Sequence, residues 1–167
     1  MMNGFEVSTV NVNGLRAAAR KDPGFVGWLA ATSADVVCLQ ETRAERDQLA
    51  AEVIAPRGWH VVLAPAAARG RAGVAVFSRV EPDAVRVGFG AAEFEDSGRY
   101  AEVDLGPVTV ASLYLPSGDV GTRGRRRRSV SWRRSFRTWP SGVRRWRRGA
   151  VSWWCAVTGT SRTGRRI

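Results

Sequence analysis

Residues 35–43 read Asp-Val-Val-Cys-Leu-Gln-Glu-Thr-Arg, and this stretch indicates the fold class. Its core, Val36–Leu39, is a short, uninterrupted apolar run, which is typical of a strand buried on both faces of its sheet. Glu41 follows almost directly, and a carboxylate at the end of a buried strand is costly unless it pairs with a cation or binds a metal. We therefore expect a central strand with a candidate functional side chain at its carboxyl end.

Helical and strand patterns flank this central strand on both sides. Before it, residues 5–10 are β-rich, and residues 15–31 have a helical spacing that Pro23-Gly24 can divide. After it, residues 45–54 return to a helical period, and short β-branched segments follow at 60–63, 73–78, 84–89, 100–105 and 108–115. A β-α-β-α start followed by a run of strands predicts an α/β layered protein with partly antiparallel sheets.

The charge distribution divides the chain near residue 120. Residues 1–120 hold all 15 acidic residues and 11 of the 26 basic ones, for a net charge of −4, whereas residues 121–167 carry 15 arginines and no acid. The second part also holds five of the seven tryptophans but no Leu, Glu or Lys. We predict a folded part over 1–120 and a basic, Arg/Trp-rich, disordered tail over 121–167.

Several protein classes are disfavoured by composition. No apolar run approaches the roughly 20 residues of a membrane span, and the first residues lack the basic region and apolar core of a signal peptide. The two cysteines, Cys38 and Cys155, are too few for a disulfide framework and have no metal-ligand spacing. We expect a cytoplasmic protein without membrane association.

Asn11 is the first candidate site residue, in the segment Thr9–Arg16 that follows the first predicted strand. The carboxyl end of a first strand is where α/β proteins place ligands. An Asn amide there can ligate a hard cation through its oxygen or donate a hydrogen bond to a phosphate. The alternative is structural, because Asn-Gly pairs are common in turns and Asn caps helices.

Glu41 and Tyr114 are the other candidates at predicted strand ends. Mg²⁺ is usually held by one or two carboxylates together with phosphate oxygens and waters, which suits Glu41. The structural alternative is a helix cap or a salt bridge to Arg43 or Arg46. Tyr114 stands at a strand end, so its hydroxyl can point into a site, although half-buried packing is the more common role of such a side chain.

Taken together and in order, these segments resemble the exodeoxyribonuclease III family of the endonuclease/exonuclease/phosphatase superfamily. The resemblance runs from about Phe5 to Gly118 and rests on five segments: NVNGLRA, DVVCLQETR, AGVAVFSR, SGRYAEVDL and SLYLPSG. It implies that residues 1–120 are the N-terminal portion of a four-layer α/β/β/α sandwich. It also implies a monomeric DNA-repair phosphodiesterase that uses Mg²⁺, or Mn²⁺ in its place, on double-stranded DNA at abasic sites and 3′ ends.

The resemblance implies roles for five residues. Glu41 would bind the metal, and Asn11 would belong to the same metal network and contribute to catalysis. Tyr114 would lie beside the scissile phosphate as a catalytic residue. Asn13 and Arg16 would bind the substrate.

The sequence departs from the family's pattern most strongly after Gly118. Within the matched part, Arg43 stands where the family usually has Lys. Beyond it, a Gly-Asp-x-Asn segment and a later Asp and Asp-His pair are missing, because no Asp follows Asp119 and no His follows His60. In the family the first of these aspartates orients or deprotonates the attacking water, so we expect a truncated and inactive chain.

The tail is predicted to be an out-of-frame reading of a GC-rich gene. Its dominant residues, Arg, Trp, Gly, Ser and Ala, have G/C-rich codons. The family-like segment Gly-Asp-Trp-Asn-Ile-Ala-His-Arg, with only third codon positions left free, can be read one base later as Val157–Gly164. Continuing with Glu-Ala-Asp-Ile yields residues 165–167 in the same way.

Two other functions compete with this interpretation. In the first, the tail binds nucleic acid without sequence preference, because arginines neutralise phosphates and aromatic rings stack on bases. In the second, the superfamily is kept but the substrate is a phosphoinositide or another phosphate ester. The segments NVNGLR and SGRYAEVDL favour the DNA-repair branch over the latter.

Overall fold

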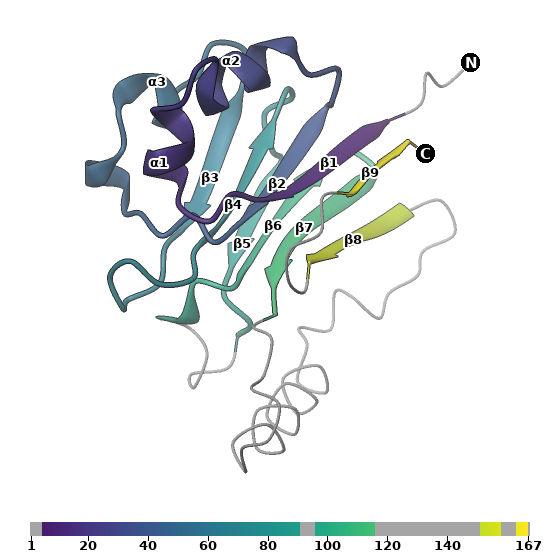
Figure 1. Cartoon of the computed structure of the whole chain (residues 1–167). Helices are drawn as coiled ribbons and strands as arrows, with labels where there is room; N and C mark the ends of the chain where they lie inside the picture. Colours follow the sequence, from purple (N-terminus) through teal and green to yellow (C-terminus); the bar gives the residue numbers. More distant parts are fainter. Residues whose placement is uncertain (1–4, 91–95, 116–150, 158–162, 167) are drawn as a thin grey trace.

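The computed structural model describes residues 5–90, 96–115, 151–157 and 163–166, and its centre is strand β2 (Val36–Gln40) (Figure 1). All five residues of β2 are buried, so the prediction of a strand buried on both faces is confirmed. Strand β1 (Glu6–Asn11) runs parallel to β2 on one side, and β4 (Val74–Ser78) runs antiparallel on the other. The carboxyl ends of β1 and β2 therefore meet at one edge of the sheet.

Two sheets are formed by the described residues. The first has the order β3-β4-β2-β1-β9, with β3 at His60–Ala64 and β9 at Thr163–Arg166. The second has the order β5-β6-β7-β8, with β5 at Ala84–Val87, β6 at Tyr100–Leu105, β7 at Val108–Tyr114 and β8 at Val151–Val157. This mixed pairing confirms the predicted α/β class with partly antiparallel sheets.

The helices are shorter than the sequence pattern suggests. Residues 15–31 form α1 (Leu15–Ala19) and α2 (Gly24–Ala31), which are divided at the predicted Pro-Gly pair. Residues 45–54, expected as one helix, form a 3-10 turn η1 (Arg46–Gln48) and a short α3 (Ala51–Ile54). The extended backbone of Ala50, with ψ 154°, separates these two elements. Among the described residues, no helix is both long enough and apolar enough to cross a bilayer.

Two segments of the predicted tail lie in strands, so the expectation of a tail without regular structure is corrected at these residues. Strand β8 pairs in parallel with β7, from Val108 opposite Val151 to Tyr114 opposite Val157. Strand β9 pairs antiparallel with β1. These two segments do not need an alternation of apolar and polar side chains, because a strand added to an existing sheet edge gains its pairing through backbone hydrogen bonds. The other residues of the tail lie outside the described part of the chain.

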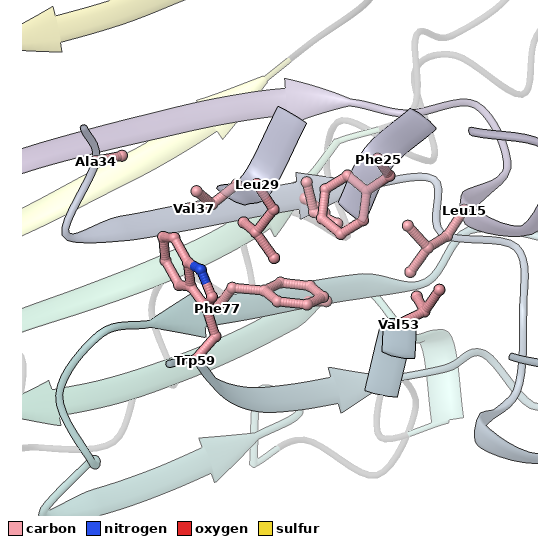
Figure 2. Packing of buried hydrophobic residues seen from close by; sticks show 10 residues of the cluster. Leu15, Phe25, Leu29, Ala34, Val37, Val53, Trp59 and Phe77 are labelled. Carbon is pink, nitrogen blue, oxygen red and sulfur yellow. The ribbon is translucent and has the colours of Figure 1, made fainter. Parts of the chain in front are cut away.

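A hydrophobic core fills the space between the helices and the first sheet (Figure 2). Phe77 of β4 is fully buried, and its ring meets Phe25 of α2 edge-on with 5.2 Å between centroids. The other buried members come from helices, strands and the segments that connect them: Leu15, Leu29, Ala34, Val37, Leu39, Val53, Trp59 and Ala75. The helices α1, α2 and α3 are thus held on one face of the first sheet by apolar contact.

A second core lies between the two sheets. Val36 and Cys38 of β2 contribute to it, together with Ala101, Val103 and Val110 from the second sheet. Neighbouring residues of β2 thus point to opposite faces, which is the period-two pattern of a strand covered on both sides. The helix layer and the two sheets supply three of the four predicted layers. No helix among the described residues covers the outer face of the second sheet.

Candidate active site

Three predicted site residues come together at the ends of three strands. Asn11 is the last residue of β1, Glu41 directly follows β2, and Tyr114 is the last residue of β7. The parallel pairing of β1 and β2 brings the first two together, with Asn11 opposite Gln40. Tyr114 reaches them from the second sheet, so the site spans the two sheets of the sandwich.

The carboxylate of Glu41 is the centre of this group. Asn11 Nδ2 donates a hydrogen bond of 2.8 Å to Glu41 Oε1, and Arg43 Nη2 donates to Oε2. The Tyr114 hydroxyl also hydrogen-bonds to this carboxylate. The Asn11 amide is itself oriented, because its Oδ1 accepts the backbone N–H of Asn13 at 3.1 Å. Three residues therefore hydrogen-bond to one acidic group, and the backbone of Asn13 orients one of the three.

The protonation states follow from these contacts. Burial raises the pKa of the Glu41 carboxyl, but the hydrogen bonds donated by its three partners outweigh burial and leave this pKa below its ordinary value. Burial and the hydrogen bond to Glu41 both raise the pKa of the Tyr114 phenol. At neutral pH the site therefore presents an ionised carboxylate beside a protonated tyrosine, which can act as a hydrogen-bond donor.

The loop that carries Glu41 has an unusual backbone. Glu41 and Arg43 have φ angles of 55° and 49°, in the left-handed region that side chains beyond Gly seldom adopt. The loop is held by hydrogen bonds from Thr42 N–H to the Gly73 carbonyl and from Arg43 N–H to the Ala72 carbonyl, at 3.0 and 2.9 Å. Left-handed backbone of this kind costs free energy and persists where the surrounding structure holds it, often at functional sites.

Gly73 allows the close approach of two chain segments at this loop. Its φ is +84°, and a Cβ placed on it would lie 2.2 Å from Thr42 Oγ1. The Thr42 side chain is fully buried, and within the described residues its hydroxyl has no hydrogen-bond partner. Glycine is therefore required at position 73 both by backbone conformation and by space.

Asn13 and Arg16, predicted as substrate contacts, lie beside this group without joining it. Both residues are exposed. Asn13 follows β1 with a φ of 46°, and Arg16 lies in the first turn of α1. Backbone bonds tie this segment to the Glu41 loop, since Gly14 N–H donates to the Glu41 carbonyl at 2.8 Å. Their role toward a substrate stays a prediction.

Two contacts of the site were not anticipated from the sequence. The guanidinium carbon of Arg99 lies 5.3 Å from the centre of the Tyr114 ring, within the range of a cation–π contact. Gln40, the residue before Glu41, is fully buried and hydrogen-bonds to side chains of both sheets. A glutamine between an apolar run and a carboxylate is the one sequence signal that could have indicated the second contact.

A family profile accounts for most of the chain. The profile of the Endonuclease/Exonuclease/phosphatase family matches residues 8–159. The chain belongs to this family. The match includes all five predicted site residues and extends to two residues beyond the end of β8.

Curated DNA nucleases are similar to about two thirds of the chain. An exodeoxyribonuclease from Bacillus subtilis is 38% identical over 111 residues, which cover 66% of this chain and 42% of the relative. The DNA repair nuclease APEX1 of Danio rerio is 29% identical, over 70% of this chain and 37% of the relative. The chain thus spans less than half the length of these relatives.

Two solved structures share the fold of this chain. An AP endonuclease from Archaeoglobus fulgidus superposes with a TM-score of 0.75 at 24% identity, over 91% of this chain and 56% of the other. A 3′ phosphatase from Neisseria, solved with a product DNA hairpin, has a TM-score of 0.66 at 25% identity, over 79% of this chain and 49% of the other. The profile and the sequence relatives confirm the predicted family, and the superpositions confirm the predicted sandwich architecture.

Nucleases of the endonuclease/exonuclease/phosphatase family generally use a divalent metal ion. The donors at this site fit such an ion, because the Glu41 carboxylate and the Asn11 amide both offer hard oxygen atoms and the Glu41 side chain is 14% exposed. Within the described residues no cluster of three or more His, Cys, Asp or Glu side chains could hold a metal. The described part of the chain would thus supply one carboxylate, and phosphate oxygens and waters the other ligands.

Proposed function

We propose that this chain descends from a Mg²⁺-dependent DNA phosphodiesterase of the exodeoxyribonuclease III type, which cleaves beside abasic sites and removes nucleotides from 3′ ends. The observation that supports this proposal most directly is the Glu41 carboxylate, which is ionised and oriented beside the Asn11 amide and the Tyr114 hydroxyl in a chain of this family. The relatives named as exodeoxyribonuclease and DNA repair nuclease support DNA as the substrate. We also propose that the protein is monomeric and cytoplasmic.

In this proposal each site residue has a distinct task. Glu41 would hold the metal ion, which supplies Lewis-acid stabilisation of charge on the phosphate when it is bound. Asn11 orients the Glu41 carboxylate through its 2.8 Å hydrogen bond. Tyr114, kept protonated by its raised pKa, would donate a hydrogen bond to a phosphate oxygen at the scissile bond. Asn13 and Arg16 would contact the DNA backbone at the edge of the site.

We further propose that this 167-residue polypeptide is inactive, because it lacks the group that activates water. No Asp follows Asp119, no Glu follows Glu102 and no His follows His60. A general base contributes about 10²–10⁴-fold to such reactions, and in this proposal Glu41 already holds the metal ion. A tail read in the wrong frame explains this loss. The codon match begins at Val157, which is the last residue of β8.

Two proteins test the proposal side by side. The chain itself, incubated with Mg²⁺ on duplex DNA that carries an abasic site or a recessed 3′ end, is expected to show no cleavage above an EDTA control. A second protein, from the same gene shifted by one base after the codon for Gly118, is expected to cleave, and its Glu41→Gln variant to lose this activity. Cleavage by the first protein would refute its inactivity, and an inactive second protein would refute the nuclease assignment.

Non-specific nucleic-acid binding is the second candidate function, and the composition of the tail favours it. Residues 121–167 carry 15 arginines and five tryptophans without any acidic residue. Phosphate neutralisation and base stacking would give binding that weakens steeply with salt. Replacement of Arg125–Arg128 by serine should then reduce the slope of log affinity against log salt by about 3–4 on duplex DNA. An unchanged slope would exclude this role for the four arginines.

A further inference from the structure

A buried polar network lies directly behind the candidate active site. Gln40 Nε2 donates hydrogen bonds to Thr9 Oγ1 and to Ser112 Oγ, both at 3.2 Å, and the Ser112 hydroxyl donates to the Leu39 carbonyl at 2.9 Å. The Thr9 hydroxyl is also within 3.3 Å of Gln40 Oε1. Gln40 and Ser112 are both fully buried. The network thus connects β1, β2 and β7 in the interior of the molecule.

Each member of the network precedes a residue of the site by one or two positions in the sequence. Thr9 precedes Asn11 by two residues on β1, and Ser112 precedes Tyr114 by two residues on β7. Residues two apart on a strand share a face of the sheet. Gln40 directly precedes Glu41. The three strands that carry the site are therefore joined by side-chain hydrogen bonds immediately before they end.

The network supplies a directional contact between the two sheets. The fully buried cluster between the sheets is made of Val, Ala, Leu and Cys side chains, which meet through apolar contact. Apolar contact is not directional, so it fixes the spacing of two sheets better than their sliding position. The Gln40–Ser112 bond joins β2 of one sheet to β7 of the other across 72 residues of sequence. The contact between Glu41 and Tyr114 crosses the same interface.

A buried amide at this position requires an explanation, because apolar side chains would fill the space without the cost of desolvating polar atoms. Polar groups buried and fully hydrogen-bonded in this way can specify one arrangement among several of similar stability. Here the arrangement that is specified brings Asn11 and Tyr114 to the two sides of Glu41.

We propose that Gln40 is a positioning residue, which acts with Thr9 and Ser112 to hold β1, β2 and β7 in the register that brings Asn11 and Tyr114 onto the Glu41 carboxylate. Only the metal-binding part of its test rests on the proposed function. In metalloproteins, side chains that orient a ligand in this way typically change metal affinity by about 10–100-fold when they are replaced.

The test compares four variants of the full 167-residue chain. Gln40→Met keeps the shape and removes the hydrogen bonds, and Thr9→Val does the same at one end of the network. Thr9→Ser keeps the hydroxyl and serves as the conservative replacement. Val36→Ala is the matched control, because Val36 is fully buried on the same strand and contributes to the apolar core between the sheets.

Three measurements are made on each variant: the midpoint of urea unfolding, the ¹⁵N–¹H resonance of the Asn11 side-chain amide, and the Mn²⁺ dissociation constant from the free-ion EPR signal. Gln40→Met and Thr9→Val are expected to shift the Asn11 amide resonance and to weaken Mn²⁺ binding by about ten-fold or more. Thr9→Ser should retain the parent values. Val36→Ala should lower the urea midpoint and leave the other two values unchanged.

The outcomes separate positioning from stability and from metal binding. A Gln40→Met variant with the parent's Asn11 resonance would overturn the proposal. A Val36→Ala variant that moves this resonance and the Mn²⁺ affinity as far as Gln40→Met does would also overturn it, by showing that loss of stability is sufficient. If the parent binds no Mn²⁺ while Gln40→Met still shifts the resonance, the positioning role is supported and the metal role of Glu41 is refuted.

Discussion

Replacement of Gly73 by Ala gives the most direct check of the geometry around Glu41. Two costs add at this position. A residue with a Cβ at a φ of +84° loses about 1–2 kcal/mol relative to Gly. The new Cβ would also lie 2.2 Å from Thr42 Oγ1, and forcing atoms into a filled interior costs about 1–3 kcal/mol. We expect Gly73→Ala to reduce the free energy of unfolding by about 3 kcal/mol.

Gly70 provides a matched control in the same loop. Its φ is +70°, close to that of Gly73, but a Cβ placed there has no heavy atom within 4 Å. Gly70→Ala should therefore cost only the backbone part, about 1–2 kcal/mol. The difference between the two variants measures the contacts of the new Cβ with Thr42 Oγ1, at 2.2 Å, and with the Arg43 backbone nitrogen, at 3.2 Å.

A double-mutant cycle measures that contact separately. Thr42→Ala removes the hydroxyl that the new Cβ would meet. The Cβ of residue 42 would then lie 3.5 Å from the new Cβ, which is an ordinary contact distance. In this background the cost of Gly73→Ala should fall toward that of Gly70→Ala, which corresponds to a coupling of about 2 kcal/mol. Urea unfolding followed by far-UV circular dichroism gives all the required free energies. Equal costs for Gly70→Ala and Gly73→Ala, or a coupling near zero, would refute the close approach of the two segments.

Three further predictions concern charge and packing. Asp104→Asn should flatten the acid limb of the stability–pH curve. A hydrogen bond from Arg86 lowers the pKa of Asp104 in the folded protein below its ordinary 3.8. The contribution of Asp104 to the free energy of unfolding is therefore present above pH 3.8 and is lost as pH falls through the lowered pKa. Parallel acid limbs for parent and variant would contradict this. Phe77→Ala should cost about 3–5 kcal/mol in urea unfolding, against less than about 0.5 for Val80→Ala, which is 61% exposed; similar costs would refute the core. Arg43→Ala should free Glu41 Oε2 and tighten Mn²⁺ binding about five-fold, or about 1 kcal/mol, by EPR; weaker binding would show that Arg43 supports the site.

The fold class could be predicted from the sequence because its signals are local. The apolar run Val36–Leu39 predicted a buried strand, and its residues do face a core on each side. The positions of Asn11, Glu41 and Tyr114 at strand ends also followed from local pattern, and their order along the chain carried the family resemblance. The helix expected over 45–54 was wrong in extent, because the extended backbone at Ala50 interrupts a pattern that remains helical in spacing.

The pairings of β8 and β9 could not be predicted from their own residues. A segment such as Thr163–Arg166 has no strand pattern, and its place beside β1 depends on an edge that only the folded sheet provides. The backbone groups at a sheet edge can accept a strand whatever its side chains are, so pairing of this kind leaves little trace in a single sequence.

The amino-acid sequence alone therefore determined the succession of strands and helices along the first part, the family and the three residues around which the site is built, since each of these is carried by short segments of local sequence. Only the tertiary structure decided what surrounds Glu41: the Gln40–Ser112 bond between residues 72 apart, the approach of Gly73 to Thr42, and the meeting of Tyr114 with a carboxylate on the opposite sheet. These contacts join strands of different sheets or distant loops, and their geometry arises from the packing of the two sheets, which no local pattern encodes.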